Sequence, residues 1–165
     1  MTRSLIASAA AAAVAGSALV LAPMTTAPAS AATSIKVKDN KRGKVLRDRV
    51  AKIAKAQAGD SYVMGATGPN AFDCSGLVVY SYRKATGKTL PRTSYMQRDQ
   101  LMSVKKRDRR VGDIVVLHNG GHVGIYVGHN KIIHASNPTR GVLFSKITGW
   151  YGGSVDGYRR VIRTR

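Results

Sequence analysis

The feature that most constrains the fold is a series of short, strand-like segments in the second half of the chain. Residues 111–118, 122–128 and 131–136 read VGDIVVLH, HVGIYVG and KIIHAS, and they are rich in β-branched side chains. The Asn-Gly-Gly and His-Asn sequences between them are typical of hairpin turns. Residues 141–147 and 157–163 continue the pattern. We therefore predict an antiparallel sheet of about five strands.

The first half of the chain has a helical pattern instead. Apolar residues at 3.6-residue spacing predict a helix over residues 43–58, a second over 73–86 and a short third over 93–102. A glycine follows each of the first two segments as a stop signal, and residues 61–70 form a glycine-rich loop. Helices followed by an antiparallel meander are typical of an α+β fold, with the helices packed on the sheet.

The first 31 residues have the features of a secretory signal peptide. Arg3 supplies positive charge, residues 5–22 are almost wholly apolar, and small residues precede position 32. The alternative is a retained membrane anchor, because about 18 apolar residues are just enough to span a bilayer. We expect secretion with residues 1–31 removed, residues 32–42 as a flexible basic segment and residues 43–165 as one catalytic domain.

The chain is strongly basic. It has 27 Lys and Arg residues, 8 acidic residues that are all Asp, and a formal net charge of +19. An exported protein with this charge is attracted to polyanions, which outside a cell are wall polymers or lipid headgroups more often than nucleic acid. Charge alone gives only nonspecific affinity for nucleic acid. We expect binding to anionic wall polymers, although the charge also serves solubility, and we expect no specific nucleic acid.

The single cysteine, Cys74, is the main candidate for catalysis. One cysteine excludes an internal disulfide and a cysteine-rich metal centre. Asp73 is placed to cap the second helix, so Cys74 is expected in its first turn, where the helix dipole lowers the pKa of a thiol. The alternatives are a buried structural cysteine and a zinc site shared with histidines. The polar Asp-Cys-Ser-Gly sequence disfavours the first, and too few ligands share a face for the second.

A thiol nucleophile needs a base, and the four histidines of the chain all follow in the predicted sheet. His122 and His134 lie on adjacent strands, and they share a face only if the hairpin between them has a three-residue or bulged turn. We therefore predict such a turn and a relay of Cys74, His122 and His134. The other two histidines are expected at the rim of the site and in a solvated turn: His118 and His129.

The segments around these residues resemble the NlpC/P60 family of cell-wall cysteine peptidases. FDCSGLVVY, LPRTS, VGDIVV, HVGIYVG and KIIHAS occur in the family's order within about residues 50–163. The resemblance implies a papain-like α+β fold. It also implies hydrolysis of amide bonds in peptidoglycan stem peptides, commonly between D-glutamate and a diamino acid. Cys74 aligns with the nucleophile, His122 with the base and His134 with the third polar member.

The resemblance extends to the substrate cleft. Tyr62 aligns with a tyrosine near the oxyanion site, and Asp73 and Ser75 align with residues that line the cleft. In some members the aspartate meets a free amino group of the substrate. The family often has Trp where this chain has Met64, so one part of the cleft wall differs.

Two other functions stay open from the sequence. An N-acetylmuramoyl-L-alanine amidase would use a similar thiol–imidazole site to cut the sugar–peptide linkage, and a non-catalytic basic module would only bind the wall. In each case we expect a secreted, wall-associated monomer that needs no cofactor and no metal ion.

Overall fold

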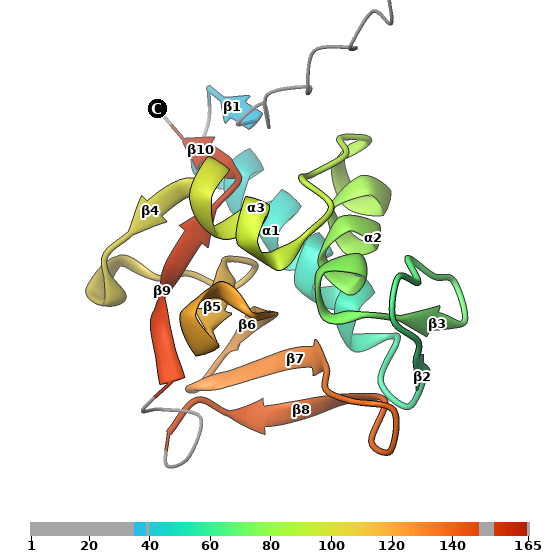
Figure 1. Cartoon of the computed structure of the whole chain (residues 1–165). Coiled ribbons are helices and arrows are strands. Elements are labelled where there is room, and N and C mark those ends of the chain that lie inside the picture. The colour runs from blue at the N-terminus through green and yellow to red at the C-terminus, as the bar shows by residue number, and fades with distance from the viewer. Residues whose placement is uncertain (1–34, 39, 149–153, 165) are drawn as a thin grey trace, which may run out of the picture.

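The described part of the chain is residues 35–38, 40–148 and 154–164 of a computed structural model, and it contains three α-helices against a six-stranded sheet (Figure 1). The predicted α+β class is confirmed. The predicted signal peptide and residues 149–153 lie outside the described residues. Among those described, no helix combines the length and hydrophobicity needed to cross a membrane.

The helices correspond to the periodic segments, with shifted ends. α1 (Asn40–Lys55) begins three residues before the predicted start, inside the segment expected to be flexible. α2 (Cys74–Thr86) begins directly after Asp73, whose side chain caps it as predicted. α3 (Ser94–Gln100) is capped by Thr93 and ends earlier than predicted, because the chain turns extended at its end.

The main sheet is antiparallel throughout, with strand order β4-β9-β5-β6-β7-β8. Four of its strands match predicted segments closely, and β4 comes from a segment whose first residue was expected to be helical. The strands, in sheet order, are β4 (Met102–Val104), β9 (Val155–Arg160), β5 (Ile114–Leu117), β6 (His122–Gly128), β7 (Lys131–Ala135) and β8 (Val142–Lys146).

The hairpin between β6 and β7 has the predicted bulge. Ile125 pairs with Ile133, and the register then shifts before Gly128 pairs with Lys131. A bulge places two residues of one strand opposite one residue of the other, so it moves the following side chains to the other face. The two histidines of this hairpin therefore share one face of the sheet.

Two small parallel pairs flank the sheet. β1 (Ile35–Val37) pairs with β10 (Ile162–Thr164), so part of the segment expected to be flexible is tied to the far end of the chain. The single strand predicted over residues 157–163 is therefore divided between β9 and β10. β2 (Ser61–Tyr62) pairs with β3 (Ala71–Phe72) at the two ends of the glycine-rich loop.

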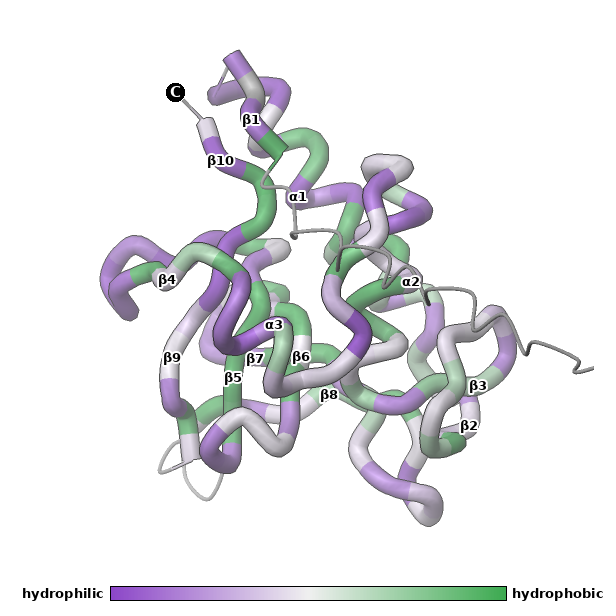
Figure 2. Tube along the Cα trace, turned by 45° about the horizontal axis from the view of Figure 1, so that its top comes forward, coloured by the Kyte–Doolittle hydropathy of each residue, from purple (hydrophilic) through white to green (hydrophobic). Residues whose placement is uncertain are grey.

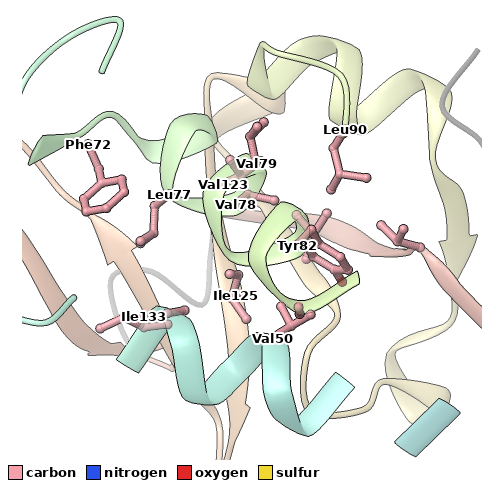
Figure 3. Packing of buried hydrophobic residues seen from close by; sticks show 14 of the residues in the cluster. Val50, Phe72, Leu77, Val78, Val79, Tyr82, Leu90, Val123, Ile125 and Ile133 are labelled. Atoms are coloured by element: carbon pink, nitrogen blue, oxygen red, sulfur yellow. The ribbon is translucent and has the colours of Figure 1, made fainter. Parts of the chain in front are cut away.

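The core lies between the helices and the sheet. Val50 of α1, Leu77 and Tyr82 of α2, and Val123 and Ile125 of β6 belong to one buried cluster (Figure 3). Hydrophobic residues follow β5, β6 and the inner side of α2, whereas the loop after β4 is hydrophilic (Figure 2). Each fully buried side chain of this size stabilises the fold by roughly 1.5–3 kcal/mol. The packing holds the start of α2 against β6.

Candidate active site

The first turn of α2 carries Cys74, which is half-buried. The turn is fixed by Asp73, whose Oδ1 accepts a hydrogen bond from the backbone N–H of Gly76 at 2.6 Å. Its Oδ2 accepts from the backbone N–H of Gly65 at 2.9 Å. These contacts join the glycine-rich loop to the helix start, so the thiol lies where the two segments meet.

Arg92 and Ser75 complete this cluster. The Arg92 guanidinium donates to both carboxylate oxygens of Asp73, at 3.1 and 2.5 Å, and to the Ser75 hydroxyl at 2.9 Å. Burial by itself raises the pKa of the Asp73 carboxyl. Hydrogen bonds from Arg92, Gly76 and Ser75 outweigh burial and hold this pKa below its ordinary value. Asp73 is thus an ionised anchor whose oxygens already have several donors.

Two imidazoles are joined in a chain of short contacts. Nε2 of His122 lies 2.7 Å from Nδ1 of His134, and the rings meet edge to face at 4.9 Å between centroids. Nε2 of His134 lies 2.9 Å from the Ser145 hydroxyl on β8. His134 is only 1% exposed, so Ser145 matters as a partner of its second nitrogen.

A cavity of about 550 Å³ is lined by both the Cys74 thiol and the His122 imidazole. Met64 and Arg92 are part of its wall, and Met64 is highly exposed at its rim. The Tyr62 hydroxyl donates to the Met64 sulfur at 3.8 Å. All the predicted site residues except His134 line the cavity: Tyr62, Asp73, Cys74, Ser75 and His122.

The electrostatics differ from the prediction for the thiol. Burial raises the pKa of the Cys74 thiol, and the Asp73 charge raises it further, against the expected lowering by the helix start. Burial, with the neighbouring His118, lowers the pKa of His122 to about 4. Burial, with His122 and Arg140, lowers the pKa of His134 to about 3. With these pKa shifts the thiol and both imidazoles are uncharged at neutral pH.

The other two histidines lie outside this chain of contacts. His118 is exposed between β5 and β6, with its ring 6.3 Å from that of His122, and His129 is exposed in the next turn. In the part of the chain that the structure describes, no group of three or more His, Cys, Asp or Glu side chains is placed to hold a metal ion.

Sequence reasoning did not identify two residues of the site, Arg92 and Ser145. Arg92 occurs in the LPRTS segment, but its pairing with Asp73 depends on how that loop folds over α2. Ser145 lies opposite Ile132 in the β7–β8 pair, two residues before His134. Ser145 and His134 are therefore diagonal neighbours, and their contact depends on a strand register that no local sequence pattern specifies.

The segment that carries the site is similar in sequence to known proteins. A model described as the NlpC/P60 family matches residues 59–155. A protein of Corynebacterium glutamicum named probable endopeptidase is 51% identical over 85 residues, which cover 51% of this chain and 40% of that protein. The Murein DD-endopeptidase MepS/Murein LD-carboxypeptidase of Escherichia coli is 38% identical over 96 residues, 56% of this chain and 50% of that protein.

Solved structures with a similar fold include members of the same family. An NlpC/P60 family protein from Bacillus cereus has a TM-score of 0.65 at 28% identity, covering 71% of this chain and 40% of that one. The peptidoglycan hydrolase RipB from Mycobacterium tuberculosis has a TM-score of 0.64 at 25% identity, covering 76% and 69%. The chain spans 40–50% of the length of the two curated relatives above.

Proposed function

This chain belongs to the NlpC/P60 family, and on that premise we propose that it is a secreted cysteine peptidase that hydrolyses amide bonds in peptidoglycan stem peptides. The bond between D-glutamate and a diamino acid is the one that the resemblance favours. One observation carries the proposal: Cys74 and His122 line the same cavity, while the far nitrogen of His122 is held by His134. Thiol, base and orienting group are the parts that acyl transfer needs.

The contacts among the imidazoles fit the tautomer that catalysis needs. A base that accepts the thiol proton at Nδ1 must carry its own proton on Nε2, and His122 then donates to Nδ1 of His134. His134 must in turn carry its proton on Nε2 and donate to the Ser145 hydroxyl. By accepting this hydrogen bond, Ser145 keeps His134 as an acceptor for Nε2–H of His122. Nδ1 of His122 then has a free lone pair that can accept the thiol proton.

Attack and proton transfer are coupled in this site. Because the resting thiol and imidazole are both uncharged, His122 takes the proton from Cys74 as Sγ bonds to the amide carbonyl carbon. The carbonyl electrons move onto oxygen and give a tetrahedral oxyanion. His122 then returns the proton to the leaving nitrogen as the C–N bond breaks, and an acyl-enzyme remains on Sγ.

Deacylation repeats these steps with water. His122 accepts a proton from water as its oxygen attacks the thioester, and Sγ leaves and is reprotonated. Backbone N–H groups at the start of α2 and the Tyr62 hydroxyl supply hydrogen bonds to the oxyanion. Burial, with Cys74 and the Asp73 carboxylate nearby, raises the pKa of Tyr62, so its hydroxyl stays a donor. One such donor contributes about 3 kcal/mol to transition-state stabilisation.

The Asp73 side chain supports the site instead of binding a substrate amine. Its oxygens accept from Arg92, Ser75 and two backbone N–H groups, and it is only 5% exposed. A substrate ammonium group would have to displace one of these donors. Arg92, whose side chain is 39% exposed, lines the cavity and is available to the substrate instead. A positive group there favours a carboxylate on the stem peptide.

The test is digestion of purified peptidoglycan by the wild-type protein and by Cys74→Ser, with the released fragments identified by mass spectrometry. We expect the variant to fold normally by circular dichroism and to lose nearly all activity. A variant that cleaves at the wild-type rate would disprove the role of Cys74. The fragment masses separate a stem-peptide endopeptidase from an amidase, and binding without fragments would identify a wall-binding module.

The location is tested separately. We expect the protein to be recovered from the culture medium or the wall as a monomer whose first residue is Ala32 or a close neighbour. N-terminal sequencing and gel filtration of the recovered protein measure both properties. A chain that keeps residues 1–31 and sediments with membranes would contradict secretion.

A further inference from the structure

A buried arginine with one guanidinium nitrogen that has no hydrogen-bond partner among the described residues lies at a distance from the catalytic cavity. Arg47, on α1, is only 4% exposed, and among the described residues its Nη1 atom has no acceptor. An unpaired N–H of a charged group is costly to bury, because water that solvated it in the unfolded chain has been removed. The described part of the fold therefore leaves this donor without an acceptor.

The surroundings of Arg47 form a basic cavity. A space of about 480 Å³ between α1 and the segment before β5 is lined by Lys44, Arg47, Arg110 and Asp48, with Asn40 and Val111. Its one acidic side chain, Asp48, binds Lys44 at 2.7 Å. Three cationic side chains against one carboxylate leave an excess of positive charge in the cavity.

The nearest buried carboxylate is already used. Asp113 accepts from Nε and Nη2 of Arg160 at 2.9 and 2.7 Å, and from the backbone N–H of Arg110 at 2.7 Å. Burial lowers the pKa of Arg47, and the charges of Arg110 and Arg160 lower it further. Like charges are thus crowded around Arg47, and an anion in the cavity would relieve that repulsion.

The cavity lies at the end of β5 away from the active site. Leu117, the last residue of β5, pairs with His122, whereas Gly112, just before β5, donates to the carbonyl of Tyr126 at 2.8 Å. Next to the cavity, residues 105–110 read KKRDRR and form the hydrophilic loop after β4 (Figure 2). An anion bound in the cavity would therefore leave the catalytic cavity free.

We propose that the cavity formed by Lys44, Arg47 and Arg110 is a binding site for a phosphate-type oxyanion, presented by a phosphodiester polymer of the cell wall. A guanidinium fork donates two parallel hydrogen bonds to phosphate oxygens, and a lysine adds a third donor. The choice of a wall polymer rests on the extracellular role proposed above, whereas the oxyanion site depends only on these side chains.

The test measures binding to the full-length protein by isothermal titration calorimetry, with inorganic phosphate and with a synthetic poly(glycerol phosphate). The variants Lys44→Gln and Arg110→Gln change the site but leave Arg47 in place, because removing a buried arginine risks unfolding. The matched controls are Lys52→Gln on the same helix and Arg107→Gln in the same loop, both exposed and outside the cavity.

We expect both site variants to weaken binding of each probe by at least about tenfold, since each loses a charge-assisted hydrogen bond, and the controls to change it by less than about twofold. Cleavage of soluble peptidoglycan fragments should be the same in all four variants. This readout separates the oxyanion site from the proposed peptidase activity. If the peptidase proposal is wrong, no variant cleaves the fragments, whereas phosphate binding is unaffected.

Three results would overturn the proposal. Equal losses in site variants and controls would show attraction to net charge alone, and equal affinity for polyglutamate would show that phosphate is not preferred. Tight binding of free phosphate without binding of the polymer would overturn the wall polymer as the source.

Discussion

Replacing Ser145 with alanine tests the tautomer argument directly. The Ser145 hydroxyl lies 2.9 Å from Nε2 of His134 and is the acceptor in the proposed tautomer, and His134 itself is 1% exposed. Without that acceptor, the tautomer of His134 that carries its proton on Nδ1 becomes more favourable. That proton then points at the Nε2–H group of His122. His122 then shifts its own proton to Nδ1, and the lone pair needed by Cys74 is lost.

The size of the effect follows from burial. A buried donor that loses its acceptor costs about 1–3 kcal/mol, which corresponds to roughly a 5- to 150-fold loss in rate. Ser145 is only partly buried, so a water molecule can reach the space left by the hydroxyl and replace part of the interaction. We therefore expect Ser145→Ala to lower kcat by about tenfold, toward the lower end of this range.

The assay is steady-state cleavage of a soluble stem-peptide fragment, with Ser145→Thr and Ser103→Ala as comparisons. Ser145→Thr keeps a hydroxyl and should restore most of kcat, and Ser103→Ala removes an exposed serine of β4 and should change nothing. KM should stay constant in all three, because Ser145 does not line the cavity. A Ser145→Ala enzyme with full kcat, or with equal losses in the threonine variant, would refute the tautomer argument.

Three further predictions follow from the site and its support. Arg92→Gln should destabilise the fold above about pH 4 and lose this effect at lower pH, because a carboxyl with a depressed pKa, here Asp73, stabilises only while ionised; urea unfolding at several pH values measures the difference, and a pH-independent difference would contradict the reasoning. Alkylation of Cys74 by iodoacetamide should still accelerate above pH 9.0, since burial raises its pKa; a plateau below about pH 7 would instead indicate a preformed thiolate. Gly76→Ala should cost about 1–3 kcal/mol in thermal unfolding, because its Cβ would lie 2.0 Å from the carbonyl oxygen of Ala66. An unchanged melting temperature would count against that clash.

Local patterns were sufficient for the elements that carry the site. The Asp-Cys-Ser-Gly sequence predicted the start of α2, and the need to place His122 and His134 on one face predicted the bulge between β6 and β7. Both are properties of short segments, where turn chemistry and side-chain alternation determine the backbone. The roles assigned to these residues stay predictions until the variants are measured.

Long-range pairings could not be predicted in this way. The parallel β1–β10 pair joins segments more than 120 residues apart, and β4 has only three residues, too few for a recognisable pattern. The direction of the Cys74 pKa was wrong for a related reason. A helix start favours the thiolate, but the degree of burial depends on how α2 packs, and burial is the larger effect here.

The two-layer packing described above has an evolutionary consequence. The proposed nucleophile belongs to a helix and the proposed base to a strand, and these two elements are held together by apolar contacts such as those of Leu77 and Val123 (Figure 3). A misplacement of about 1 Å can reduce catalysis by about a hundredfold. Selection on the interior of this domain would therefore act on the alignment of these two groups as well as on stability, and a substitution there would abolish the proposed activity while the protein remains folded and abundant.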